Sequence, residues 1–258
     1  MIAELIKGSP NILELIYKDL AQPSVRAVGS ALGTVFEFST SFLLPVKLLN
    51  EKIKLIFTKN LNDYKDKLEK VSEEKICEVH PQIGIPIIEK LTCTTNAEIA
   101  DLFTTLLVNA SNIDMVNTAH PSFINIIERL TPDEARIIKY LKDNSDILYC
   151  DFRALTGKNN GYVDVAQYLT LVPFEVELQY PDNINAYFAN LVSLGILIDM
   201  NGTHKLDQKV YDQIKDKYEF EEYKLKIDTK YFIGFTTNDS FFTVTDFGKL
   251  FIAACTES

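Results

Sequence analysis

The residues that could carry metal or acid–base chemistry are few and widely spaced in this chain. The three histidines, His80, His120 and His204, have no H-x-H or H-x-x-x-H partner that would place two ligands on one side of a strand or helix. His80 and His120 each precede a proline, which favours a role in capping the next helix. A metal site made by His80, His120 and a cysteine has no support from spacing, so we expect no metal and no cofactor.

Motifs for nucleophilic catalysis and for phosphate binding are absent from the sequence. There is no G-x-S-x-G, no G-x-x-x-x-G-K-[ST] and no G-x-G-x-x-G. Gly157-Lys158 lacks the upstream glycine and the following hydroxyl of a phosphate-binding loop. The four cysteines, Cys77, Cys93, Cys150 and Cys255, show no C-x-x-C spacing, which predicts reduced and buried thiols. We therefore predict a protein that is not an enzyme.

Carboxylates gather in two short stretches late in the chain. The first stretch contains Asp143, Asp146 and Asp151, and the second contains Asp216, Glu219, Glu221 and Glu222. A divalent ion needs oxygens that converge from separate elements, which spacing alone does not predict. The usual meaning of such runs is a solvated loop or helix end, and we interpret both stretches in that way.

Composition narrows the class of protein. The chain has 258 residues, of which 47% are hydrophobic and 24% are charged, as in globular proteins. Its net charge of −10 does not favour a nucleic-acid binder, because phosphate binding needs a cationic surface. The start of the chain lacks the basic region and cleavage site of a signal peptide. We expect a cytoplasmic protein.

The element most suggestive of a mechanism is the apolar stretch 27–46, whose only charge is Glu37. It is long enough to span a bilayer, but it is rich in Ser and Thr and contains Pro45. We predict two long helices, about 27–44 and 46–71, with a kink at Pro45. Their shared apolar side and the lysines after it form a candidate membrane or interaction face, made of Val28, Leu32, Val35, Phe42, Val46, Leu49, Ile53, Ile56, Lys47, Lys52 and Lys54.

Two interpretations of this face stay open. In the first, residues 27–46 form a core helix, because Glu37 at mid-membrane would cost about 2.5–3.5 kcal/mol. In the second, the segment meets a membrane only under some condition, and its small residues allow close helix packing. The second interpretation would place the protein at the periphery of the inner membrane.

The segment from Pro81 to Asp143 predicts short helices only. Thr95–Glu98 and Thr131–Glu134 both have the T-x-x-E pattern of a capping box, which opens helices 96–110 and 132–143. A further helix is expected at 121–130. Residues 1–143 are therefore predicted to form a helical domain that begins with long amphipathic helices.

After Asp143 the pattern changes to a mixture of strands and helices. Strands are expected at 146–152, 196–199, 226–235 and 241–244, and helices at 183–194, 207–218 and 246–255. Gly195 should end a helix, and Asn201-Gly202 should form a tight turn. The segments NLVSLGIL and FFTVTDFGKLFIAAC resemble parts of winged-helix domains. The predicted fold is mainly α, with a smaller winged-helix-like α+β domain at 144–258.

Several blocks of the chain, taken in order within about residues 17–200, carry a family resemblance. They include DLAQPSVRAVGSALGTV, PQIGIPIIEKLTCTTNAEIADLFTTLLVNASN and AHPSFINIIERLTPDEARIIKYL. These blocks resemble the abortive infection alpha (Abi-alpha) family of bacterial proteins. The resemblance implies anti-phage defence, in which an infected cell stops growing or dies before phage release. It supplies no catalytic residues. The chain departs from the family pattern at 37–40, where relatives are more apolar.

The resemblance and the residues together lead to two functional hypotheses. The first is a non-enzymatic abortive-infection protein that acts on the membrane through its N-terminal helices. The second is a cytosolic protein-interaction or regulatory module of winged-helix type. We expect a protein partner or phage trigger of unknown identity, and we keep a membrane surface and a second copy of the chain as further partners.

Overall fold

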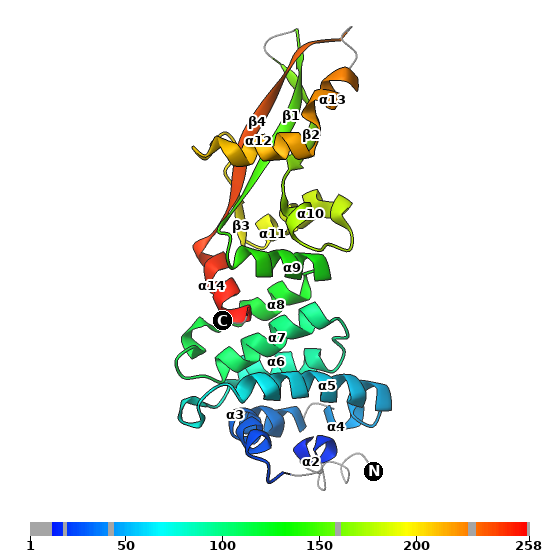
Figure 1. Ribbon diagram of the computed structural model, residues 1–258. Helices are drawn as coiled ribbons and strands as arrows, with labels where there is room; N and C mark the ends of the chain where they lie inside the picture. The colour runs from blue at the N-terminus through cyan, green and yellow to red at the C-terminus, as the bar shows by residue number, and fades with distance from the viewer. Residues whose placement is uncertain (1–11, 18–19, 41–43, 158–160, 227–230, 257–258) are drawn as a thin grey trace. The chain divides into compact units, whose positions relative to one another are not determined.

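The computed structural model describes residues 12–17, 20–40, 44–157, 161–226 and 231–256. It is mainly helical, with one antiparallel sheet in its C-terminal part (Figure 1). The described residues form two compact units, which we describe separately. The helical unit contains the described residues up to 135 together with 250–256, and the sheet unit contains 136–249. We predicted two domains that meet at residues 143 and 144. This stays a prediction, because it concerns whether each part folds independently.

The helical unit is a stack of helices in chain order. They are α2 (Ile12–Ile16), α3 (Pro23–Thr40), α4 (Leu44–Lys47), α5 (Glu51–Leu68), α6 (Pro81–Leu91), α7 (Ala97–Ala110) and α8 (Ser122–Glu128). Helix α7 packs against α5, α6 and α8, and it is buried on all sides from Leu102 to Val108. Its two buried threonines are satisfied by Lys67, whose Nζ donates to Thr104 Oγ1 at 3.0 Å and to Thr105 Oγ1 at 2.7 Å.

Local hydrogen bonds set several helix starts, two of them as the sequence predicts. The Thr131 capping box is confirmed, because Thr131 N donates to Glu134 Oε2 at 2.6 Å and Glu134 N donates to Thr131 Oγ1 at 3.2 Å. It opens α9 (Pro132–Leu141). His80 caps α6, with its Nδ1 accepting from Gln82 N. The prediction for Thr95 is wrong, since the N-cap of α7 is Asn96, whose Oδ1 accepts from Ile99 N.

The apolar stretch 27–46 does not form one long helix with its successor. Helix α3 is described as far as Thr40, and residues 41–43 lie outside the described residues. Helix α4 is a single turn that contains Pro45, and α5 starts anew after Asn50. The Asn50 side chain accepts from Lys52 N and Ile53 N, so it stops the preceding turn and caps α5. Among the helices of the described residues, none combines the length and the hydropathy needed to cross a membrane.

The sheet unit is built on four antiparallel strands in the order β2-β1-β4-β3. Their bounds are β1 (Asp146–Thr156), β2 (Tyr162–Leu169), β3 (Leu197–Asp199) and β4 (Phe232–Val244). The helices of this unit are α10 (Val172–Glu175), α11 (Ile184–Ser193), α12 (Gln208–Lys217) and α13 (Phe220–Lys226), and α14 (Asp246–Cys255) begins in it and continues into the helical unit. Gly195 and Gly202 have positive φ after α11 and in the tight turn, as predicted.

One predicted feature of this unit is wrong. Residues 236–239 do not connect two strands but continue β4, pairing with Cys150–Arg153 of β1. Their Thr, Asn and Asp residues suggest a turn, but the long partner strand overrides that local preference. Between residues 162 and 179, β2 gives way to the single turn α10.

Both faces of the sheet are covered by aromatic and aliphatic side chains. Helices α12 and α13 lie on one face, where Cys150 and Phe152 pack with Tyr211, Ile214 and Phe220 (Figure 1). On the other face, Phe188 of α11 lies 4.9 Å from Phe242, measured between ring centroids. The segment Thr245–Gly248 is fixed by two hydrogen bonds of one threonine. Thr245 Oγ1 accepts from Gly248 N at 2.8 Å and donates to Gly195 O.

Candidate functional site

The edge strand β2 bulges twice against β1. Phe152 pairs with Ala166 and Arg153 pairs with Asp164, so Val165 has no partner residue in this pairing. A second irregularity lies nearer the strand end, where Tyr168 has a φ of 54°. Bulges twist a strand and interrupt its hydrogen-bond ladder, which reduces the tendency of an exposed edge to pair with another chain.

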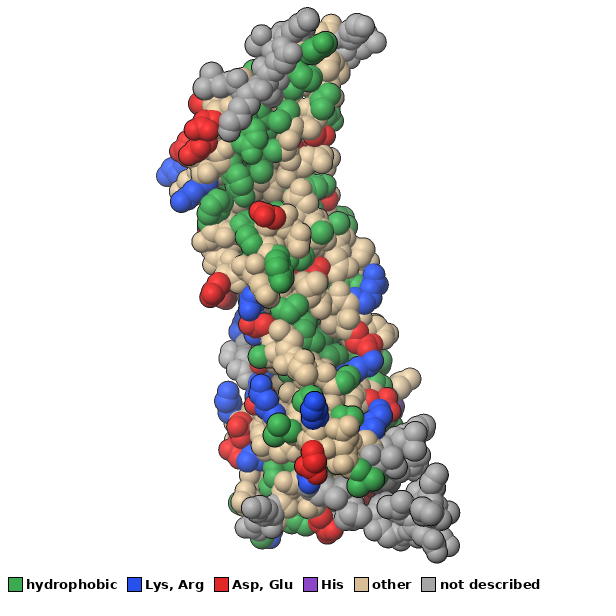
Figure 2. Space-filling model, turned by 90° about the vertical axis from the view of Figure 1, so that its right-hand side faces the viewer, with side chains coloured by type: hydrophobic (Ala, Val, Ile, Leu, Met, Phe, Trp, Pro, Cys, Tyr) green, Lys and Arg blue, Asp and Glu red, His purple; other side chains and the backbone are tan. Residues whose placement is uncertain are grey.

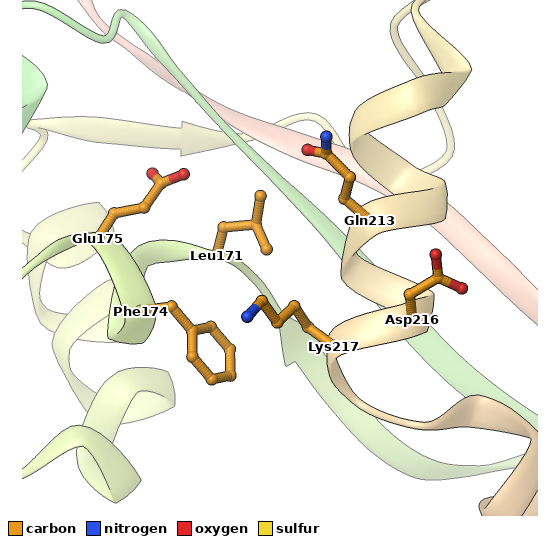
Figure 3. A pocket seen from close by; sticks show the side chains of 6 residues that line it. All are labelled: Leu171, Phe174, Glu175, Gln213, Asp216 and Lys217. Atoms are coloured by element: carbon orange, nitrogen blue, oxygen red, sulfur yellow. The ribbon is translucent and has the colours of Figure 1, made fainter.

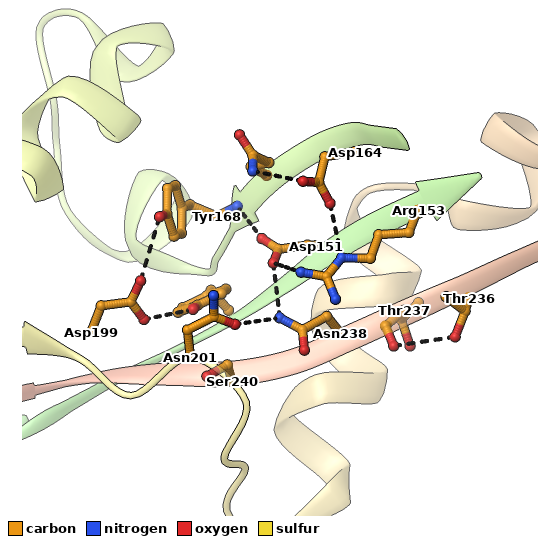
Figure 4. A network of polar contacts seen from close by, with 12 residues as sticks. Asp151, Arg153, Asp164, Tyr168, Asp199, Asn201, Thr236, Thr237, Asn238 and Ser240 are labelled. Atoms are coloured by element: carbon orange, nitrogen blue, oxygen red, sulfur yellow. Dashed lines mark hydrogen bonds and ion pairs between the residues drawn. The ribbon is translucent and has the colours of Figure 1, made fainter. Parts of the chain in front are cut away.

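Asp151 compensates for the interrupted ladder. Its side chain is buried, and its Oδ1 accepts from Tyr168 N at 3.0 Å. Its Oδ2 accepts from Asn238 Nδ2 at 2.9 Å and from Arg153 at 3.4 Å, as Figure 4 shows. Arg153 also donates to Asp164 at 2.8 Å. A buried carboxylate is stable only when its oxygens are satisfied in this way.

The network continues to the end of β3. Asp199 accepts from Tyr149 Oη at 2.7 Å and from Tyr168 Oη at 3.4 Å. Burial is the main cause that raises the pKa of the Tyr149 hydroxyl, so it stays a neutral donor. Asn238 Nδ2 also donates to Asn201 Oδ1 at 3.1 Å. These bonds join β1 to β2 and β4, and join both β1 and β2 to the end of β3, and we interpret this network as a scaffold.

Cys150 and Cys255 occupy core positions, and His120 lies in a turn. Among the described residues, no group of three or more His, Cys, Asp or Glu side chains is placed to hold a metal ion. Burial raises the pKa of the Cys150 and Cys255 thiols, so neither is poised as a thiolate. His120 Nδ1 accepts from Ser122 N at 3.1 Å, which is a turn contact.

A groove lies between α10 and α12 on the sheet unit. Its cavity is about 540 Å³ and is lined by Leu171, Phe174, Glu175, Gln213, Asp216 and Lys217. Figure 3 shows Lys217 reaching from α12 toward Leu171 and Phe174. The Phe174 ring is 53% exposed. It is held in place by Tyr218, at 5.5 Å between ring centroids and edge-on, and by the Lys217 ammonium at 5.4 Å.

A second cavity of about 260 Å³ shares three of these residues, Leu171, Glu175 and Gln213. Here the Tyr140 hydroxyl donates to Glu175 Oε2 at 2.6 Å. Burial is the larger cause that raises the pKa of Tyr140, and this hydrogen bond is the next. Tyr218 Oη donates to Thr170 O at 2.9 Å, which ties the segment before α10 to the end of α12. The walls of the groove are therefore fixed by hydrogen bonds as well as by packing.

The predicted membrane or interaction face divides into several environments. Val28, Leu32 and Val35 are fully buried on α3. Ile53, Ile56 and Lys54 are half-buried on α5, whereas Leu49, Lys47 and Lys52 are exposed. Phe42 lies outside the described residues, and the side chain of Val46 is not among those described. The structure thus does not bring these residues together on one surface.

The groove was not predicted from the sequence. Phe174 and Lys217 lie 43 positions apart, and no short motif joins them. One local signal was available, because Pro173 suits the first turn of a helix and separates α10 from β2. The exposure of Phe174, however, depends on how α12 packs across the sheet, which no local pattern specifies.

Comparison with known proteins identifies the relatives of this chain. The family model for abortive infection alpha matches residues 56–255. The chain belongs to the abortive infection alpha family. Its matched segment includes the whole sheet unit and starts at Ile56, so α3, α4 and most of the predicted membrane face precede it. The name of the family points to abortive-infection defence.

Two further comparisons give no information about the function of this abortive infection alpha protein. No curated protein matches it. One solved structure, an uncharacterized protein from the hydrocarbon-degrading marine bacterium Alcanivorax borkumensis SK2, is 17% identical with a TM-score of 0.35. The match covers 51% of this chain and 90% of the other. At this TM-score the likeness supports no argument about function.

Proposed function

We propose that this protein is a non-enzymatic anti-phage defence protein of bacteria that acts by binding another protein through the groove between α10 and α12. The observation that carries the proposal is the Phe174 ring, which is exposed yet held by Tyr218 and Lys217. A fixed aromatic ring loses little freedom on binding, and rings of this kind dominate the energy of protein interfaces.

The lining of the groove suits a peptide segment. Leu171 and Phe174 offer an apolar contact, and Glu175, Asp216 and Lys217 provide a polar rim. Interfaces commonly combine an apolar centre with such a rim. Exposed carboxylates outnumber lysines here, with Glu177, Asp212 and Glu219 also exposed nearby in the chain. A partner segment with an apolar anchor and basic neighbours would match this lining.

A winged-helix relationship is part of the proposal. The strand order β1-β4-β3, with α11 leading into β3 and α14 following β4, supports it. In such domains the helix at the position of α11 often reads DNA. Helix α11, INAYFANLVS, has no Lys or Arg, which supports a protein partner in place of nucleic acid.

The test uses Phe174→Ala in cells exposed to phage, with plaque formation as the readout. Phe174→Ala should abolish protection while leaving the thermal midpoint close to that of the unmodified protein, because the ring is half exposed. The matched control is Tyr231→Ala, which removes a ring that is 68% exposed on the same unit but away from the groove lining.

The two variants give a clear decision. Protection that survives Phe174→Ala would contradict the groove as the functional surface. Equal loss in both variants would show that exposed aromatic rings matter only for abundance or folding. A photo-reactive amino acid placed at position 174 should also give a discrete cross-linked species during infection, and the same probe at position 231 should not.

A further inference from the structure

The turn before α5 and the first half of that helix expose leucines between lysines. Leu49 is 68% exposed and Leu55 is 73% exposed. Lys47, Lys52 and Lys59 are exposed as well, whereas Lys54 is half-buried. Lys52, Leu55 and Lys59 follow one another at spacings of three and four, which places them on one side of the helix. We call this set the Leu55 strip: Lys47, Leu49, Lys52, Leu55 and Lys59.

The strip is cationic in an acidic protein. From Lys52 to Asn62 the chain has no Asp or Glu, although its net charge is −10. Glu51 is the one acidic residue between Lys47 and Asn62. Figure 2 shows Lys and Arg side chains near hydrophobic ones on this part of the helical unit, with acidic side chains among them. Leucines flanked by lysines on one helix are typical of helices that lie at a membrane interface.

The strip is available without any rearrangement of the helical unit. The opposite side of α5 is held in the core by Phe57, Leu61 and Tyr64, each fully buried. Leu49 precedes the N-cap Asn50, a position from which a leucine often packs onto its own helix, yet it stays exposed. A contact made by the strip would therefore leave α3 and its buried residues in place.

We propose that the Leu55 strip docks this protein on a lipid surface that carries anionic headgroups. Its leucines would enter the boundary between headgroups and acyl chains, and its lysines would approach the lipid phosphates. This contact is peripheral and independent of the groove. A lipid surface suits the strip because its exposed lysines complement lipid phosphates and its exposed leucines lie between them.

The experiment is co-sedimentation of the full-length protein with vesicles. Vesicles of phosphatidylethanolamine with phosphatidylglycerol should carry the protein into the pellet, and phosphatidylcholine vesicles should not. Removing a lysine charge near a lipid surface weakens binding about fivefold, so Lys59→Glu should weaken it at least that much. Leu55→Asn should weaken it by a similar factor, because one leucine no longer enters the boundary region.

Matched controls come from the sheet unit. Leu206→Asn and Lys209→Glu change a leucine that is 96% exposed and an exposed lysine outside the strip, so both should bind vesicles normally. Phe174→Ala should also bind normally, which separates this proposal from the groove. The proposal is overturned if the protein stays in the supernatant with both vesicle types, if phosphatidylcholine binds equally well, or if the control variants lose as much binding as the strip variants.

Discussion

At the scale of single residues, Gly248 and Asp151 stabilise the sheet unit through short contacts. Gly248 is the clearest case, since a Cβ at this position would lie 2.3 Å from the carbonyl oxygen of Ile196. The start of α14 can approach Ile196, the residue before β3, only because position 248 has no side chain. Asp151 is a second case, because it accepts the Tyr168 N–H that the bulge removes from the ladder.

We expect Gly248→Ala to lower the free energy of unfolding by more than about 2 kcal/mol, because backbone atoms cannot yield to the new methyl group. Gly33→Ala is the matched control. Gly33 lies inside α3, and no atom lies within 4 Å of the place that its Cβ would take, so alanine should stabilise the helix by roughly 0.5–1 kcal/mol. Urea denaturation of both variants measures the difference, and equal effects would contradict the close approach at Ile196.

At the scale of elements, α3 is a core helix of the helical unit. Ala31 O accepts from Val79 N at 2.9 Å, and Thr34 N donates to Glu78 Oε1 at 3.2 Å. Val35 packs so closely on α6 that a Cβ at Gly84 would lie 2.4 Å from its methyl group. These contacts support the core interpretation of residues 27–40 over insertion into a membrane, which would require α3 to leave its neighbours.

Leu32→Asp separates these interpretations. Leu32 is fully buried, so an unpaired carboxylate there should lower the free energy of unfolding by several kcal/mol and reduce folded protein at ordinary temperature. Phe38→Asp on the same helix should have a small effect, because Phe38 is 49% exposed. Circular dichroism during thermal unfolding measures both. A folded Leu32→Asp variant that has lost only its defence activity would instead favour a membrane face.

At the scale of the whole molecule, buried tyrosines link stability to alkaline pH. Burial raises the pKa of Tyr17 from 10.0 to about 12 and also raises the pKa of Tyr64, whose hydroxyl bonds with Ser111 Oγ at 2.7 Å. The neutral form of each phenol is therefore favoured in the folded state. The resulting stability is fully present below pH 10.0, the pKa in the unfolded chain, and is lost as the pH rises toward about 12.

The expected outcome is a fall in the urea midpoint as the pH passes through the ordinary tyrosine pKa. Tyr64→Phe should reduce this fall, since phenylalanine keeps the ring packing but cannot ionise. A midpoint that does not change with pH in the unmodified protein would contradict the linkage.

Features that depend on neighbours within a few residues could be predicted from the sequence alone. The capping box at Thr131, the cap by His80, the end of α11 at Gly195 and the Asn201-Gly202 turn all follow from short-range hydrogen bonds or backbone freedom. The family and the mainly helical composition were also predictable. Even these local predictions were incomplete, because Thr95 and Asn96 are both good caps and the structure uses Asn96.

Which surfaces are buried and which are open could be learned only from the folded chain. Periodicity placed Val28, Leu32 and Leu49 on one predicted face, yet the first two are buried and the third is exposed, because Asn50 ends the turn and starts a new helix. Pairing with β1 turned the apparent loop 236–239 into strand. The groove at Phe174 arose in the same way, from two segments distant in sequence. Burial and strand pairing are energies of long-range contact, and a local pattern does not contain them.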